Sequence, residues 1–256
     1  MPHQDHPRAT ASAAHHQDLK TVLDWLTADA DFAAVRFRGS CTWSPRGLTC
    51  AALLWAWSDE ATLVDRFAAA RKVATASLGL EAATAATYQA FLKLLRAWTA
   101  TLALALVAAL RRRMREDLPE RFAVAGFAAF GVDGSRLQLP RTASNEGRFS
   151  APPKRQSKSK SKSKDHAAEA ARRKKADSPQ LWLTTTFHLG TGLPWDWRTG
   201  ATDSSEREHL RQMLPGLPAG ALVVADAGFV GDETWEAVLA GGRQRLVRIG
   251  ADVRRL

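Results

Sequence analysis

The spacing of apolar residues predicts helices in the first half of the chain. Residues 22–26 begin a stripe of apolar side chains at helical intervals. Ser44 followed by Pro45 is a helix-start signal, and residues 58–60 give another. The longest helix is expected to begin near residue 82 and to run to Arg115. The first 120 residues or so are therefore predicted to be all helical.

The pattern changes to that of strands after residue 121. Apolar residues lead into Asp133, which is expected to end the first strand, and residues 136–139 then alternate between polar and apolar. Residues 181–187 alternate in the same way. The Gly-Thr-Gly turn at 190–192 that follows them predicts a β-hairpin.

The last part of the chain alternates between helix and strand. Asp203, followed three residues later by Glu206, predicts a capping box that opens a helix. Residues 221–225 are a continuous apolar run that ends at Asp226, which is typical of a strand buried on both faces. Another helix and a strand at 246–249 follow. This order predicts an α/β fold, with a mixed sheet behind an all-helical N-terminal domain.

A strongly basic segment interrupts the strands at about residues 144–178. Between Lys154 and Lys175 there are ten basic residues and two acidic ones, so this segment carries most of the net charge of +10. Such a composition cannot bury a core and predicts a disordered insert. Two interpretations stay open: a solubilising insert, or a salt-sensitive contact with DNA phosphates that does not depend on sequence.

The basic balance of the whole chain favours an acidic partner, most often nucleic acid. The arginines near the end of the long predicted helix suit a helix C-terminus and are equally well placed to contact phosphate. The candidate nucleic-acid-binding residues are Arg111, Arg112, Arg113, Arg115, Lys154, Arg155, Lys158, Lys160, Lys162, Lys164, Arg172, Arg173, Lys174 and Lys175.

Other features of the sequence argue against a secreted protein, a membrane protein and a zinc-binding protein. Residues 1–17 lack the apolar core of a signal peptide and predict a disordered tail. The uncharged run between Arg96 and Arg111 is shorter than the roughly 20 residues that cross a bilayer, which predicts a buried helix, no membrane partner and a cytoplasmic protein. Cys41 and Cys50 have no second pair to complete a zinc site. Two buried free thiols are expected there, and a disulfide between them stays open.

Two aspartates are placed where an α/β sheet builds a site. Asp133 follows Phe-Gly-Val, and Asp226 follows Val-Val-Ala at the end of the apolar run. Either aspartate alone is often turn chemistry, because Asp and Gly both favour bends. Two carboxylates brought together repel each other unless a cation lies between them. Hard oxygen ligands suit Mg²⁺ or Mn²⁺, and a pair of such ions can promote attack on a phosphodiester.

The two aspartate motifs resemble the catalytic blocks of the insertion-sequence-four type of DDE transposases. The residues DGSRLQLP at 133–140 are similar to the first block. The residues VADAGF at 224–229, followed by LVR at 246–248, are similar to the second. The two aspartates are 93 residues apart, which is also similar to that family.

This resemblance implies a function and a domain plan. It implies a helical DNA-binding domain at 18–120 and a ribonuclease-H-like catalytic domain at 121–256, with Asp133 and Asp226 as catalytic ligands of Mg²⁺ or Mn²⁺. The third acid of the family is a Glu far downstream, in a block with Tyr, Arg and Lys that is missing here. We therefore expect this chain alone not to transpose DNA. Many relatives carry Arg after the second Asp, where this chain has Ala227.

The implied partner is double-stranded DNA at the terminal inverted repeats, bound by a homodimer on paired ends. One alternative is a DNA-binding remnant without catalysis, and another is a ribonuclease-H-like nuclease that acts on RNA or on junctions. A transposase would show metal-dependent cleavage that needs both aspartates, whereas a DNA-binding remnant would not. A nucleophilic Cys enzyme is disfavoured, because both cysteines lie in the helical part and His188 and His209 are isolated.

Overall fold

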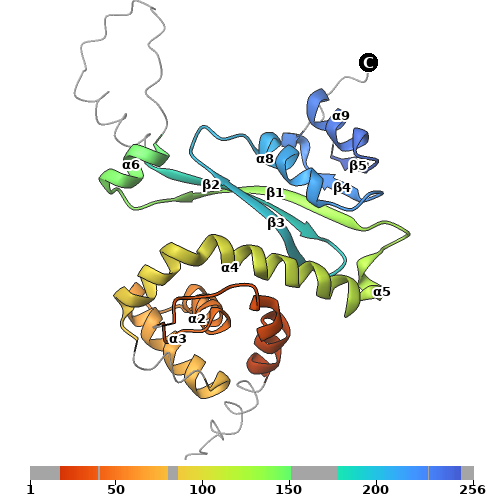
Figure 1. Cartoon of the computed structure of the whole chain (residues 1–256). Coiled ribbons are helices and arrows are strands. Elements are labelled where there is room, and N and C mark those ends of the chain that lie inside the picture. Colours follow the sequence, from red (N-terminus) through yellow and green to blue (C-terminus); the bar gives the residue numbers. More distant parts are fainter. Residues whose placement is uncertain (1–17, 40, 80–85, 151–177, 230, 249–256) are drawn as a thin grey trace, which may run out of the picture. The chain divides into compact units, whose positions relative to one another are not determined.

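The computed structural model describes residues 18–39, 41–79, 86–150, 178–229 and 231–248. The chain divides into two compact units, Met1–Arg113 and Met114–Leu256 (Figure 1). The first is built from helices and the second around a mixed sheet, which confirms the predicted α/β class with a helical first part. The predicted tail at 1–17 and all the basic residues between Lys154 and Lys175 lie outside the described residues.

Local capping signals set the helices of the first unit. The Ser44 side chain accepts a hydrogen bond from the Gly47 amide, which confirms the predicted start at Pro45. The predicted start at 58–60 was wrong, because Ser58 ends one helix and Thr62 caps the next. The elements are a helical segment at 18–26, η1 (Asp29–Phe32), α2 (Pro45–Trp57), α3 (Leu63–Leu78) and α4 (Tyr88–Glu116).

Aromatic residues form the centre of the first unit. The rings of Phe67 and Phe91 stack with centroids 4.6 Å apart, and Trp55 meets Phe91 edge-on at 5.5 Å. The predicted burial of both cysteines is correct only for Cys50, since Cys41 is half-buried, and both are free thiols. Besides Phe67 and Phe91, the buried residues of the hydrophobic core of the first unit are Phe32, Trp43, Leu48, Ala51 and Leu102.

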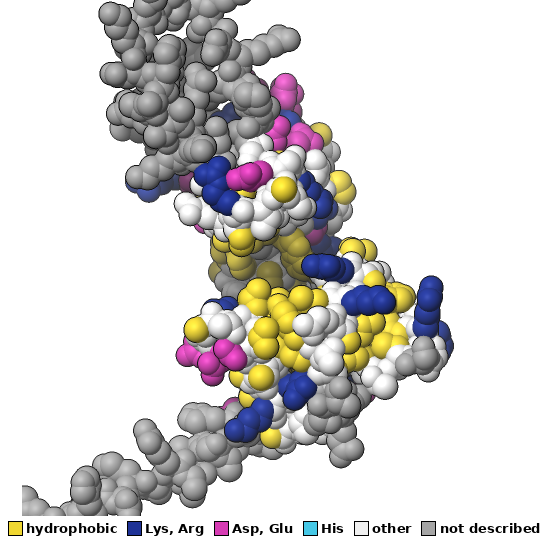
Figure 2. Space-filling model, turned by 90° about the vertical axis from the view of Figure 1, so that its left-hand side faces the viewer, with side chains coloured by type: hydrophobic (Ala, Val, Ile, Leu, Met, Phe, Trp, Pro, Cys, Tyr) yellow, Lys and Arg dark blue, Asp and Glu magenta, His cyan; other side chains and the backbone are white. Residues whose placement is uncertain are grey.

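The helix α4 is long and apolar. Among the described residues it is the one helix that meets the length and composition needed to cross a membrane. A helix that lines a core passes the same test, and Phe91 and Leu102 of α4 are buried in the core of the first unit. Its side chains are not buried throughout, since Leu104 is 73% exposed, so the prediction of a buried helix was correct for one side only. Figure 2 shows hydrophobic side chains at the surface of the helical unit beside Lys and Arg.

The second unit contains a five-stranded sheet in the order β3-β2-β1-β4-β5. The pairs β1–β2 and β2–β3 are antiparallel, whereas β1–β4 and β4–β5 are parallel. The predicted hairpin joins β2 to β3, with Gly192 in its turn at φ +70°. The strands are β1 (Ala129–Gln138), β2 (Gln180–His188), β3 (Leu193–Gly200), β4 (Leu222–Ala225) and β5 (Gln244–Val247).

Helices follow the strands in the predicted order. Two of them, α8 and α9, pack against each other and cover one face of the sheet (Figure 1). The short helices are α5 (Pro119–Phe122), α6 (Ala143–Phe149), α8 (Glu206–Met213) and α9 (Asp232–Ala240), with 3-10 turns η3 (Leu214–Gly216) and η4 (Ala227–Phe229).

The structure corrects two of the predicted boundaries. The predicted capping box was wrong, because Ser205 and not Asp203 caps α8, by accepting from the Glu208 amide. The disordered insert was predicted to start near residue 144, yet residues 143–149 form α6, whose cap is Thr142. In both cases a hydroxyl directly before the helix satisfies one of the free first-turn amides.

The two faces of the sheet differ in burial. On one face Phe130, His188 and Trp195 are fully buried, and the Trp195 ring meets Phe130 edge-on at 4.9 Å. The prediction that the strand at 221–225 is buried on both faces was wrong, since burial along β4 alternates. The pairing aligns Leu246, Val224, Gly131 and Phe187 across β5, β4, β1 and β2 on the opposite face. In this row Leu246 is 58% exposed and Phe187 40%.

Gly190 allows the β2–β3 turn to approach the backbone of α5 closely. A Cβ on Gly190 would lie 1.9 Å from the Arg121 carbonyl oxygen, and no change of rotamer relieves a clash with backbone. We expect Gly190→Ala to lower the free energy of unfolding by about 1–3 kcal/mol, measured by urea denaturation. Gly147→Ala is the control, because a Cβ there meets no described atom within 4 Å. Equal losses in both variants would contradict the close approach.

Candidate metal-binding site

Asp133 lies within a strand, which corrects the predicted position at a strand end. β1 continues to Gln138 along β2, whereas its parallel pairing with β4 ends at Gly131 opposite Val224. Asp133 therefore lies two residues beyond the point where β1 loses its neighbour on one side. Its carboxylate is exposed, and Oδ1 accepts a hydrogen bond of 2.8 Å from the Gly134 amide.

Asp226 follows the last residue of β4, as predicted. Its Oδ1 accepts a hydrogen bond of 2.8 Å from the Gly228 amide in the turn η4. A Cβ on Gly228 would lie 3.0 Å from the same oxygen, so the small residue lets the turn close around the carboxylate. Asp226 is exposed, like Asp133.

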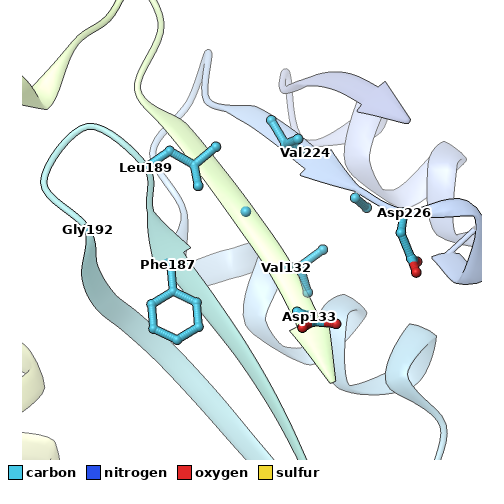
Figure 3. Close-up of a pocket in the computed structure, with 9 residues that line it drawn as sticks. Val132, Asp133, Phe187, Leu189, Gly192, Val224 and Asp226 are labelled. Carbon is cyan, nitrogen blue, oxygen red and sulfur yellow. The ribbon is translucent and has the colours of Figure 1, made fainter. Parts of the chain in front are cut away.

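The strand register brings the two aspartates to one place. Gly131 and Val224 are direct partners in the parallel pair of β1 and β4. Asp133 lies two residues after Gly131, and Asp226 lies two residues after Val224. Because side chains alternate along strands, Asp133 and Asp226 lie on the same face and at the same level as each other. Figure 3 shows both carboxylates at one end of a hollow, which is also lined by Phe187, Leu189 and Val224.

Glu206, which was predicted from the sequence only as part of a capping box, is a third carboxylate at this end of the sheet. It is the first residue of α8, and a Cβ on Gly134 would lie 2.0 Å from its Oε1. The carboxylate therefore rests against the residue that follows Asp133. This proximity arises because α8 packs on β1, β2 and β3, which no sequence spacing encodes.

The surroundings of Glu206 raise its pKa. Burial raises the pKa of Glu206 above its ordinary value, and the negative charges of Asp226 and Asp133 raise it further. Arg136 opposes these effects and lowers the pKa of Glu206. Three acids thus share one electrostatic environment.

Arg207 links α8 to the turn that carries Asp226. Its Nε donates a hydrogen bond of 3.0 Å to the Gly228 carbonyl oxygen, and the Gly228 amide binds Asp226. Deeper in the same unit, the Thr184 hydroxyl lies 2.9 Å from Nδ1 of buried His209 and ties α8 to β2. The first turn of α8 is therefore held both to the turn that follows Asp226 and to β2.

The donor set fits a hard divalent cation. Each aspartate has one oxygen bound to a backbone amide, and its second oxygen, Oδ2, is available to a ligand. Within the described ranges, however, no three His, Cys, Asp or Glu side chains are grouped closely enough to hold an ion as they stand. Asp133 and Asp226 are thus two exposed carboxylates on one face, and Glu206 lies near them without forming a group of three with them.

The two histidines have roles in the fold. Nε2 of His188 donates to the Phe122 carbonyl oxygen at 2.9 Å, and its ring stacks on Phe122. Burial lowers the pKa of His188 and of His209, and nearby Arg198 also lowers that of His209. Both rings are buried, which makes them structural residues of the second unit.

The candidate phosphate-binding arginines at the end of α4 have different surroundings. Arg113 is buried and pairs with Asp31, and Nη2 of Arg112 lies 2.6 Å from Oδ1 of the same carboxylate. The Arg115 guanidinium lies 5.1 Å from the centroid of the Trp195 ring. Arg111 is half-buried. Arg113 is the least accessible to a phosphate, whereas Arg112 keeps half of its side chain exposed.

Comparisons of the chain with protein-family models, with curated proteins and with solved structures find no match. Function is therefore inferred from the site itself and from the resemblance of its two motifs.

Proposed function

We propose that the second unit is a ribonuclease-H-like catalytic domain of a DDE-type transposase, which cleaves double-stranded DNA with the help of Mg²⁺ or Mn²⁺. The observation that carries this proposal is the parallel register of β1 and β4, which sets Asp133 and Asp226 side by side on one face. A mixed sheet in the order β3-β2-β1-β4-β5 is compatible with the fold that the motifs imply.

The residues of the site divide the work of binding and orientation. Asp133 and Asp226 would hold the cation through their exposed carboxylates, while Gly134 and Gly228 fix the orientation of each carboxylate through a backbone amide. Bound divalent ions promote attack of a water or a 3′-hydroxyl on a phosphodiester and stabilise the leaving oxygen. Arg207 supplies positive charge on the Asp226 turn, although residue 227 is Ala.

Metal-dependent cleavage of duplex DNA tests the proposal. The substrate is duplex DNA with the sequences that flank the coding region, and the proteins are this chain and a form extended through the adjacent reading frame. We expect cleavage by the extended form only, and we expect this cleavage to require Mg²⁺ or Mn²⁺ and to be lost in Asp133→Asn and in Asp226→Asn. Asp59→Asn, which removes an exposed carboxylate in the helical unit, is the matched control and should keep full activity.

A DNA-binding remnant without catalysis is the second candidate. The observation in its favour is that no three His, Cys, Asp or Glu side chains of the described residues are grouped closely enough to hold a metal ion. Salt-sensitive binding of duplex DNA without cleavage by either form of the protein would favour the remnant and contradict the enzymatic proposal.

A further inference from the structure

We propose that His209 makes the attachment of α8 to the sheet dependent on pH, so that the neutral imidazole holds the helix in place and the protonated imidazole releases it. This role does not depend on the proposed function, because it concerns the packing of one helix rather than the chemistry at the aspartates.

The first support is that the His209 ring joins α8 to two strands. Nδ1 lies 2.9 Å from the hydroxyl of Thr184, which is fully buried on β2. On the side of β3, a Cβ on Gly200 would lie 2.9 Å from Nε2, so the ring rests directly against the backbone of that strand. His209 itself is only 5% exposed. An imidazolium in this position would have little contact with water, which makes its charge costly.

The second support is the set of charges around the ring. Arg198 of β3 brings a positive charge close to His209, and its Nη2 donates a hydrogen bond of 3.4 Å to the Gln212 carbonyl oxygen of α8. Glu208 is the acid that acts on His209 among the described residues, and its carboxylate already pairs with Arg211 at 2.6 Å. A proton on His209 would therefore place a second cation beside Arg198.

The other elements packed against α8 direct their charges to different residues of the helix. Glu233 of α9 pairs with Arg211 at 3.0 Å, and Arg136 of β1 acts on Glu206. The turn η3 consists of Leu, Pro and Gly and carries no charged side chain. These contacts do not offset a proton on His209.

The direction of the pH effect follows from these surroundings. Burial lowers the pKa of His209, and the charge of Arg198 lowers it further, whereas Glu208 raises it. Above about pH 6.5, the usual pKa of an exposed imidazole, His209 is neutral whether or not α8 is attached. As the pH falls below this value, only the released imidazole takes up a proton. Attachment therefore weakens until the lowered pKa of the attached form is reached.

Release of α8 would reach the turn that follows Asp226. Nε of Arg207 on α8 donates to the Gly228 carbonyl oxygen, and the Gly228 amide donates to Asp226. This turn loses its contact with α8 when the helix leaves the sheet. Mild acid would thereby loosen the support of one aspartate without a change in its own charge.

Hydrogen exchange of the whole 256-residue chain tests this role. Protection factors, corrected for the intrinsic pH dependence of exchange, are measured for α8 and for β4 between about pH 7.5 and about pH 5.5. We expect the protection of α8 to fall by as much as about tenfold per pH unit below about pH 6.5, because release takes up one proton. Protection of α8 should also stay below that of β4 and change little at low urea concentrations, as in a local opening.

Three variants assign the effect to His209. His209→Asn keeps a group that can bond to Thr184 and should remove the pH dependence of α8 protection. Arg198→Gln keeps the imidazole but removes the cation beside it, so the dependence should become smaller. His188→Gln is the matched control, because it removes the other buried imidazole of the second unit, which contacts Phe122 and Thr191 and not α8.

Several outcomes would overturn the role of His209. One is protection of α8 that does not change with pH in the parent, and another is a pH dependence that persists unchanged in His209→Asn. Equal protection of α8 and β4 at every pH would show that the helix leaves the sheet only when the whole unit unfolds. The experiment contains neither metal nor DNA, so its result is separate from that of the cleavage test.

Discussion

Asp31→Ala should unfold the first unit at a much lower urea concentration than the parent. The Asp31 side chain is 3% exposed, and it pairs with buried Arg113 and with Arg112. It also accepts a hydrogen bond of 2.9 Å from the Ala28 amide. Removal of one partner leaves a buried guanidinium without its counter-charge, which costs about 3–5 kcal/mol of unfolding free energy.

Asp29→Ala is the matched control for this prediction. Asp29 lies in the same short helix η1, but its side chain is 82% exposed and its pair with Arg46 is long, at 3.8 Å. We expect little change in the urea midpoint, because exposed ion pairs contribute little to stability. Similar losses in Asp29→Ala and Asp31→Ala would show that the buried pair is not what holds α4 to η1.

The contacts of Asp31 with Arg112 and Arg113 also bear on DNA binding. Arg112 and Arg113 were predicted as phosphate contacts from a run of arginines, yet both contact Asp31, which is more than 80 residues away in sequence. A charge run identifies neither its partners nor its burial, since both depend on which helices pack together. Candidate contacts with phosphate are therefore better sought among other exposed side chains, such as Arg207.

Signals that act within a few residues were predicted well from the sequence. Ser44 before Pro45 and the turn at Gly192 give a helix start and a hairpin through local hydrogen bonds and local backbone geometry. The prediction of Asp203 as the cap was wrong, because Ser205, which lies two positions later, caps α8.

Features that depend on the sheet were predicted only in part. Asp226 was correctly placed after a strand, whereas Asp133 lies within one, because β2 is a longer neighbour of β1 than β4 is. The proximity of Glu206 to the aspartates was not predicted, since it arises only when α8 packs on the sheet. The one available signal was its position in the first helix between the two aspartate motifs, and that signal also fits an ordinary helix start.

Phe130→Ala should destabilise the second unit as strongly as Asp31→Ala destabilises the first. Phe130 is fully buried on β1, and its ring meets Trp195 at 4.9 Å and His188 at 5.1 Å. The substitution leaves a cavity between the sheet and the elements that cover it. We expect a loss of about 3–5 kcal/mol of unfolding free energy, measured by urea denaturation followed by circular dichroism.

Phe187→Ala is the control, since it changes the same residue type on the neighbouring strand and on the opposite face. Phe187 is 40% exposed, so its removal should cost about 1 kcal/mol. The difference between the two variants measures how unequally the faces of the sheet are covered. A loss in Phe187→Ala as large as that in Phe130→Ala would mean that the face with Asp133, Val224 and Leu246 is covered in solution. The route of a DNA substrate to the two aspartates would then have to lie elsewhere.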